Sequence, residues 1–252
     1  MTKERQLDPT ILREYDIRGI VGDTLNPEDL RAIGHGFGTI IARGGGTCVA
    51  IGYDGRLSSP ELAAAAVEGL SAAGLRVMKV GRGPSPMLYY ATHVLEADAG
   101  MMITGSHNPP DYNGIKMSLG AGSFFGDDIQ NLGKLVAAGD FLNAEGSQED
   151  CPVFDDYITR LQKDYSGSKE LSVAWDNGNG AAGEALVALV AGLPGRHILL
   201  NEKIDGTFPA HHPDPTVEKN LQQLKDSVAR EGCDMGIAFD GDGDRIGLVD
   251  SQ

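Results

Sequence analysis

Short apolar runs alternate with helix-like stretches along the chain, and this alternation limits the fold more than any other feature of the sequence. Apolar and β-branched runs, most of them bounded by glycine, predict strands at residues 48–52, 75–80, 99–103, 114–119, 171–175, 197–200 and 235–239. Stretches with helical periodicity lie between most of them, at residues 27–42, 59–73, 154–165, 181–191 and 217–231. Strands that alternate with helices predict an α/β architecture with a largely parallel sheet.

The alternating pattern occurs twice in similar form, which predicts two units in tandem. The run VAIGYDGR at 49–56 precedes a helix and a strand, and the run VAWDNGNG at 173–180 does the same. A polar segment that contains glycine separates the two units at residues 139–152. The length of 252 residues suits two medium domains, which we expect at residues 1–150 and 151–252.

The charge balance and the cysteines limit the partners and the compartment. A formal net charge of −15 argues against nucleic acid and anionic membranes as partners, because both require basic patches, but it does not exclude a phosphorylated substrate. Cys48, Cys151 and Cys233 are far apart and predict reduced thiols. The sequence begins without the apolar stretch of a signal peptide and has no long apolar run, so we expect a cytoplasmic protein.

The loop TGSHNPPDYNGIK at 104–116 follows a predicted strand and contains a candidate nucleophile. Ser106 stands just past the strand's C-terminal end, where the active sites of parallel α/β sheets gather. A serine in that position can carry a phosphoryl group, and His107 and Lys116 are nearby cations or proton carriers. These residues alone leave open a rigid turn with a capping serine, and they lack the GxSxG pattern of serine hydrolases.

The run FDGDGDR at 239–245 predicts a metal site. Asp240, Asp242 and Asp244 lie on one side of an extended chain, where their charges repel unless a divalent ion is bound. Ligands that are all oxygen favour Mg²⁺ or Ca²⁺ over zinc. An EF-hand does not fit, because Arg245 stands where that loop requires glycine. The alternative is a solvated acidic turn.

Two further segments have residues that suit an anion. Arg18, in the run REYDIRGI at 13–20, could present its guanidinium to a phosphate, although a surface ion-pair segment is the alternative. The run GYDGRLSSP at 52–60 lies between a strand and a helix N-terminus. It could bind an anion there, or Ser58 or Ser59 could cap the helix.

Two loops of the second unit have weaker signals. The run DNGNG at 176–180 lacks the patterns of phosphate-binding loops, so it predicts a structural turn. The run HHPDP at 211–215 predicts a proline-rich loop rather than a metal site, because adjacent histidines point apart in an extended chain.

Taken together, the motifs resemble those of one enzyme family. REYDIRGI, GYDGRLSSP, TGSHNPPDYNGIKM, HHPDP and FDGDGDR stand in the order and at the spacings that resemble α-D-phosphohexomutases of the phosphomannomutase/phosphoglucomutase type. The resemblance covers essentially the whole chain but only domains 1 and 2 of a four-domain enzyme. The expected fold is two tandem three-layer α/β/α domains with mixed, largely parallel sheets, and the expected partners are the missing C-terminal domains 3 and 4.

The resemblance implies a phosphoryl transfer through Ser106. Such enzymes interconvert hexose 1-phosphate and hexose 6-phosphate, of mannose or glucose, through a phosphoserine and a hexose 1,6-bisphosphate that also serves as activator. It implies that Mg²⁺ is bound by Asp240, Asp242, Asp244 and the phosphorylated Ser106.

The resemblance also implies roles for neighbouring residues. Lys116 is the expected general base, with a pKa lowered by neighbouring cations. Arg18 and Arg245 would stabilise the charge of the phosphoryl oxygens, and His107 would orient the phosphoserine. Tyr15, Arg18 and Lys116 would contact the hexose phosphate.

Two alternatives remain at this level. A strand followed by DGDGD also resembles haloacid-dehalogenase-type phosphatases, in which Asp240 would be the nucleophile and Asp242 the acid/base. The other alternative is a metal-binding fragment without catalytic activity. Phosphoaspartate in place of phosphoserine would support the phosphatase.

Overall fold

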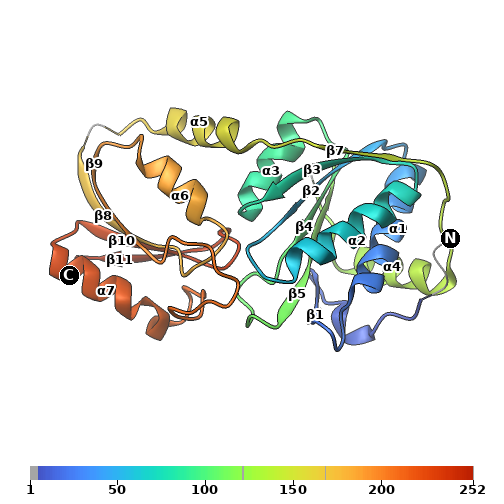
Figure 1. Cartoon of the computed structure of the whole chain (residues 1–252), viewed down its shortest axis with the longest axis horizontal. Coiled ribbons are helices and arrows are strands. Elements are labelled where there is room, and N and C mark those ends of the chain that lie inside the picture. The colour runs from blue at the N-terminus through green and yellow to red at the C-terminus, as the bar shows by residue number, and fades with distance from the viewer. Residues whose placement is uncertain (1–4, 121, 168, 252) are drawn as a thin grey trace.

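A computed structural model describes residues 5–120, 122–167 and 169–251, and these residues form two sheets, each covered by helices (Figure 1). The first sheet has the strand order β1-β5-β4-β2-β3-β7, with β6 paired to β5. Its strands are β1 Ile17–Ile20, β2 Cys48–Tyr53, β3 Arg76–Arg82, β4 Ala99–Ile103, β5 Tyr112–Leu119, β6 Gly122–Ser123 and β7 Ser147–Asp150. The centre is parallel, whereas β5 runs antiparallel to β1, β4 and β6.

Helices cover both faces of the first sheet, because successive residues of its strands point to opposite faces. The helices are α1 Pro27–Arg43, α2 Ser59–Ala72, α3 Ser85–Val94 and α4 Asp127–Ala138, after the short 3₁₀ helix η1 Pro9–Ile11. In β2, Val49 and Ile51 pack into the core beneath α1, α2 and α4, and Ala50 packs into the core beneath α3. This domain is therefore a three-layer α/β/α unit.

The helix pair α1 and α2 packs with backbone close to backbone. A Cβ atom on Gly69 would lie 2.1 Å from the carbonyl oxygen of Arg31, and one on Gly34 would lie 2.5 Å from that of Ala66. Only glycine fits at such contacts, so these two positions determine how closely the helices approach.

The second sheet has the strand order β11-β10-β8-β9 and is parallel except for the pairing of β10 with β11. Its strands are β8 Leu171–Asp176, β9 Gly195–Leu200, β10 Met235–Phe239 and β11 Ile246–Asp250. The helices α5 Phe154–Asp164 and α6 Gly183–Val190 lie on one side, and η2 Glu218–Leu221 and α7 Gln222–Glu231 lie on the other (Figure 1). Within the described residues, no helix is long and apolar enough to cross a membrane.

The expected fold class is confirmed, with two tandem α/β/α units and mixed, largely parallel sheets. Every predicted strand and helix is present, although the helix predicted at 217–231 begins as the 3₁₀ turn η2 before it continues as α7. The strands β1, β6, β7 and β11 and the helices α3 and α4 were not predicted from the sequence. Because β7 pairs with the first sheet up to Asp150 and α5 begins at Phe154, we still propose a domain boundary near residue 150.

Candidate active site

Two loops from different sheets meet at Ser106. One loop follows β4, and the other follows β10. Ser106 is buried, and its Oγ donates a hydrogen bond to Oδ2 of Asp240 at 2.9 Å, across 134 residues of sequence. A Cβ atom on Gly241 would lie 2.2 Å from the carbonyl oxygen of Ser106, so glycine is required where the loops touch. The fold therefore brings the candidate nucleophile to the candidate metal loop.

The three aspartates form the cluster that the sequence predicts. Carboxylate oxygens of Asp240, Asp242 and Asp244 all lie within 4.8 Å of one another, and the first two residues are fully buried. Burial, followed by repulsion from Asp242 and Asp244, raises the pKa of Asp240 to about 7. Among the residues that the structure describes, the buried Oδ1 of Asp242 has no hydrogen-bond partner. A hard divalent cation such as Mg²⁺ would relieve both the repulsion and this unmet acceptor, so the residues present fit a metal site.

Ser85 at the start of α3 holds the metal loop in place. Its Oγ donates to Oδ2 of Asp242 at 2.5 Å, and its backbone N–H donates to the carbonyl oxygen of Asp242 at 2.8 Å. A helix of the first domain thus positions an aspartate of the second. This residue was not predicted as part of the site, because the sequence shows only a serine between two prolines at the start of a helix.

Lys116 lies on β5 and reaches the same carboxylates. Its Nζ is 2.7 Å from Asp242 and 2.5 Å from Asp244. Burial opposes the charged form, but the two carboxylates outweigh burial and raise the pKa of Lys116. The expectation of a pKa lowered by cations is therefore wrong, because the neighbours of this ammonium group are anions.

His107 lies beside Ser106, with its Nδ1 3.5 Å from the serine Oγ. Burial, followed by the charge of Arg245, lowers the pKa of His107, which favours a neutral imidazole. A cavity of about 530 Å³ next to the cluster is lined by Tyr15, Lys116 and Arg245, among others. The structure therefore brings these three predicted residues to one cavity.

Arg18 is placed differently from the expectation. Its side chain is buried, Nη1 donates to the carbonyl oxygen of Thr104 at 2.9 Å, and Nη2 pairs with Asp16. It is thus neither part of a surface ion pair nor a guanidinium presented to the cavity that Lys116 lines. Its Nε is buried and has no hydrogen-bond partner within the described part of the chain. In this arrangement Arg18 supports the chain just before Ser106, and its contact with substrate stays a prediction.

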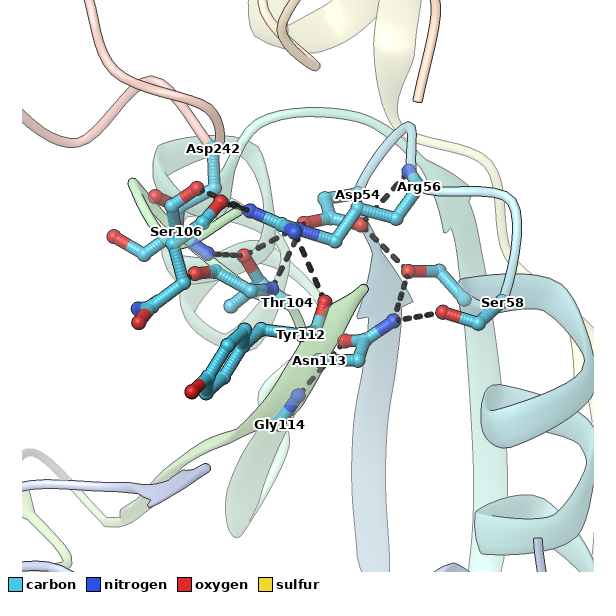
Figure 2. A network of polar contacts seen from close by, with 12 residues as sticks. Asp54, Arg56, Ser58, Thr104, Ser106, Tyr112, Asn113, Gly114 and Asp242 are labelled. Carbon is cyan, nitrogen blue, oxygen red and sulfur yellow. Dashed lines mark hydrogen bonds and ion pairs between the residues drawn. The ribbon is translucent and has the colours of Figure 1, made fainter. Parts of the chain in front are cut away.

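The segment that follows β2 also supports the serine loop, a contact that was not predicted from the sequence. Oδ2 of Asp54 accepts hydrogen bonds from Thr104 Oγ1 at 2.9 Å and from the Gly105 N–H at 3.1 Å (Figure 2). The helix-cap interpretation is wrong, since Ser58 makes no side-chain cap bond and Ser59 donates to Asp54. In the segment 52–60, which could have bound an anion, the carboxylate of Asp54 therefore accepts these hydrogen bonds.

The two loops with weaker signals contact each other. His211 Nε2 lies 2.8 Å from Oδ2 of Asp176, and a hydrogen bond to this carboxylate raises the pKa of His211, although burial partly opposes the shift. Neither loop adds an acidic or histidine side chain to the aspartate cluster. Among the described residues, Asp240, Asp242 and Asp244 are the one acidic, histidine or cysteine group close enough to hold a metal.

Comparisons with known proteins identify a family for this chain. The family model described as phosphoglucomutase/phosphomannomutase, alpha/beta/alpha domain I matches residues 9–142. The model of domain II of the same family matches residues 155–252. The two matches therefore follow each other in the order of the family's own domains and cover most of the chain.

Individual relatives extend this agreement to nearly the full chain. The phosphomannomutase/phosphoglucomutase of Pseudomonas aeruginosa is 43% identical over 247 residues, 98% of this chain and 53% of that protein. A phosphoglucomutase of Neisseria meningitidis is 41% identical over 241 residues, 95% of this chain and 52% of that protein.

A solved structure shows the same fold. A phosphoglucomutase/phosphomannomutase family protein from Burkholderia thailandensis has a TM-score of 0.94 at 40% identity, and the match covers 97% of this chain and 55% of that one. This chain thus spans about half the length of the curated relatives that it matches. With both domain models matched in order, the chain belongs to the phosphoglucomutase/phosphomannomutase family.

Proposed function

We propose that this chain is the N-terminal half of a phosphohexomutase that interconverts hexose 1-phosphate and hexose 6-phosphate, of mannose or glucose, through a phosphoserine at Ser106. The observation that carries the proposal is the hydrogen bond of 2.9 Å between Ser106 Oγ and Asp240, within a cluster of three carboxylates. A nucleophile beside a cation site is the arrangement that phosphoryl transfer requires.

Asp240, Asp242, Asp244 and the phosphorylated Ser106 would hold Mg²⁺. When bound there, the ion supplies positive charge that stabilises the transferring phosphoryl group. The loop itself positions the first of these carboxylates, since the backbone N–H groups of Asp244 and Arg245 each donate to Oδ1 of Asp240 at 3.1 Å.

The transfer itself can be assigned to groups around the cavity. The phosphoryl–oxygen bond at Ser106 breaks while a hydroxyl of the hexose phosphate forms the new bond and loses its proton, which gives the 1,6-bisphosphate. The released Ser106 Oγ takes up a proton and becomes the hydroxyl that donates to Asp240. Lys116 is our candidate acceptor of the proton that the hexose hydroxyl loses. It can accept a proton only in its neutral form, which requires that Asp242 and Asp244 no longer pair with its ammonium group. Return of the other phosphoryl group to Ser106 completes the isomerisation.

The remaining residues would bind the substrate and orient the serine loop. Arg245 and Tyr15 line the cavity and would contact the phosphate and the sugar. Arg18 supports the serine loop through its hydrogen bond to the carbonyl oxygen of Thr104. His107 would orient the phosphoserine from its position beside the Oγ atom. The expected cytoplasmic location stays a prediction.

The chain's length bears on this proposal. Because the chain matches about half of its relatives' length, we propose that two further domains complete the substrate site. We also propose, from the resemblance of its motifs alone, that hexose 1,6-bisphosphate acts as activator. A phosphatase with Asp240 as nucleophile is not favoured by the family match. In this structure Asp240 accepts the hydrogen bond of Ser106.

Peptide mass spectrometry after incubation with glucose 1,6-bisphosphate and Mg²⁺ tests the proposal. We expect one phosphoryl group on Ser106, none in Ser106→Ala, and a strongly reduced amount in Asp242→Ala, because that variant loses one of the carboxylates that would hold the metal. Phosphoaspartate at Asp240 would instead support the phosphatase. Absence of phosphoserine even after the C-terminal half of a relative is added would contradict the proposal.

A further inference from the structure

A buried guanidinium, that of Arg56, collects the carbonyl groups of the serine loop. Arg56 is 1% exposed, and it uses all five of its N–H donors. Four donors go to carbonyl oxygens of a single segment, those of Ser106 at 2.8 Å, Asn108 at 2.7 Å, Pro109 at 2.5 Å and Tyr112 at 2.9 Å. The fifth goes to Asp54 at 3.2 Å (Figure 2).

Asp54 completes a buried pair that holds the serine loop at both ends. Its carboxylate accepts from Arg56 and, at the beginning of the loop, from Thr104 Oγ1 and the Gly105 N–H. Arg56 binds the carbonyl oxygens from Ser106 onward. A buried ion pair is a poor source of stability but a good means of imposing one arrangement, provided that its hydrogen bonds are satisfied, and here they are.

The arrangement that the pair imposes is a strained one. Ser106 has φ +48°, a left-handed conformation that residues with a Cβ atom avoid and keep only where the surroundings determine it. A Cβ atom on Gly105 would lie 2.1 Å from Nε of Arg56, so the guanidinium occupies the space next to this glycine. The strained backbone aims Ser106 Oγ at Asp240.

The second domain covers the same arginine. The ring of Phe208 lies over the guanidinium, with Cζ of Arg56 5.1 Å from the ring centroid, and Phe208 itself has φ +50°. A Cβ atom on Gly206 would lie 2.7 Å from Cα of Arg56. Two strained residues, one from each domain, therefore contact one guanidinium.

We propose that Arg56, paired with Asp54 and covered by Phe208, is a positioning residue that aims Ser106 at the aspartate cluster. It acts through the loop, since it is buried and all its loop contacts are to backbone oxygens. The inference rests on the proposed function for its kinetic consequence, but the ordering of the loop is a separate, measurable property.

The test uses Arg56→Lys in the full chain, with two readouts. Lysine keeps the charge but has no fork, so it cannot bind four carbonyl groups. We expect hydrogen exchange to become roughly tenfold faster in peptides that cover 104–112, and not in peptides from β2 or α1. We expect the maximal rate of Ser106 phosphorylation by glucose 1,6-bisphosphate to fall about a hundredfold, with the half-saturating donor concentration nearly unchanged.

The matched control is Arg82→Lys. Arg82 also joins the two domains, through Glu184 on α6, but it is half exposed and does not touch the serine loop. This variant should behave as the unmodified chain in both readouts. Equal loop exchange in Arg56→Lys and Arg82→Lys would overturn the proposal, as would a kinetic loss confined to the half-saturating concentration.

Two other outcomes are also decisive. If the unmodified chain is never phosphorylated, the proposed function is in question, and hydrogen exchange alone decides whether Arg56 orders the loop. If hydrogen exchange in Arg56→Lys is faster in peptides from the whole chain, the substitution has disturbed more than the serine loop. The variant Phe208→Leu is then measured in its place, because that change removes only the ring over the guanidinium. Faster exchange confined to 104–112 would then support the proposal, and unchanged exchange would overturn it.

Discussion

The hydroxyl of Ser106 has a carboxylate, not the adjacent imidazole, as its nearest partner. Oδ2 of Asp240 is at 2.9 Å, whereas Nδ1 of His107 is at 3.5 Å, at the limit of a hydrogen bond. A serine activated by histidine requires the closer contact to the ring. The geometry at this residue therefore does not favour activation by His107, and it is compatible with the phosphoserine that we propose within the carboxylate cluster.

At the same scale, His211 should make stability depend on pH. Its pKa is raised in the folded state through Asp176, so its contribution is fully present below the unfolded pKa of about 6.5 and is lost as pH rises through the folded pKa. We expect His211→Gln to lower the free energy of unfolding by about 1 kcal/mol more at pH 6 than at pH 9, by urea denaturation. The same loss at both pH values would contradict this, and His93→Gln, at an exposed position of α3, is the control.

Among the elements, the pair α1 and α2 shows how far a helix contact can depend on single residues. Asn26 and Asp29 form a capping box at the start of α1, and Pro27 stands in its first turn, so the beginning of this helix was readable from sequence. Its closeness to α2 was not readable, because glycine within a helix is usually unfavourable and has no local signature of a helix contact.

Gly69→Ala should therefore destabilise the protein although alanine is the better helix former. The added Cβ would meet backbone atoms, 2.1 Å from the Arg31 oxygen and 2.7 Å from the His35 nitrogen, so the helices must separate. We expect a loss of about 1–3 kcal/mol in urea unfolding. In the matched change Gly133→Ala on α4, the Cβ would meet only the end of the flexible Leu12 side chain, and the loss should be small. Equal losses would refute the packing argument.

For the molecule as a whole, the site joins two domains. Asp240, Asp242 and Asp244 come from a loop of the second domain, whereas Ser85, Ser106 and Lys116 come from the first domain. A ligand of the aspartate cluster consequently acts on contacts of both domains at once. Mg²⁺ should therefore stabilise the molecule as one unit and not the second domain alone.

Mg²⁺ should raise the melting temperature of the full chain in a single transition, since binding to the folded state alone stabilises it. The gain is about 2.7 kcal/mol at a concentration one hundred times Kd. Asp242→Asn should abolish most of that shift, as measured by differential scanning calorimetry with and without chelator. Asp155→Asn, at an exposed position of α5, should keep it. A shift that survives Asp242→Asn would remove the aspartate cluster as the metal site.

The sequence predicted most of the fold, and its omissions have physical causes. The strands with continuous apolar runs were found because they are buried on both faces. β7 was missed because its four residues are polar and exposed at the sheet edge, where no burial pattern forms. The helix α4 was also not predicted, although Ile129, Leu132 and Val136 have the spacing of one helix face and the sequence therefore contains the signal for it.

By itself, the sequence determined the α/β alternation, the glycine-rich aspartate loop and the serine loop after a strand, because each depends on neighbouring residues. Only the tertiary structure decided that Lys116 faces two carboxylates, that Arg18 points back to Thr104, and that Arg56 holds the serine loop. These contacts join groups that are 50 to 128 residues apart in the sequence. The charge that a buried group faces depends on which distant chain segment packs against it, and local sequence carries no record of that partner.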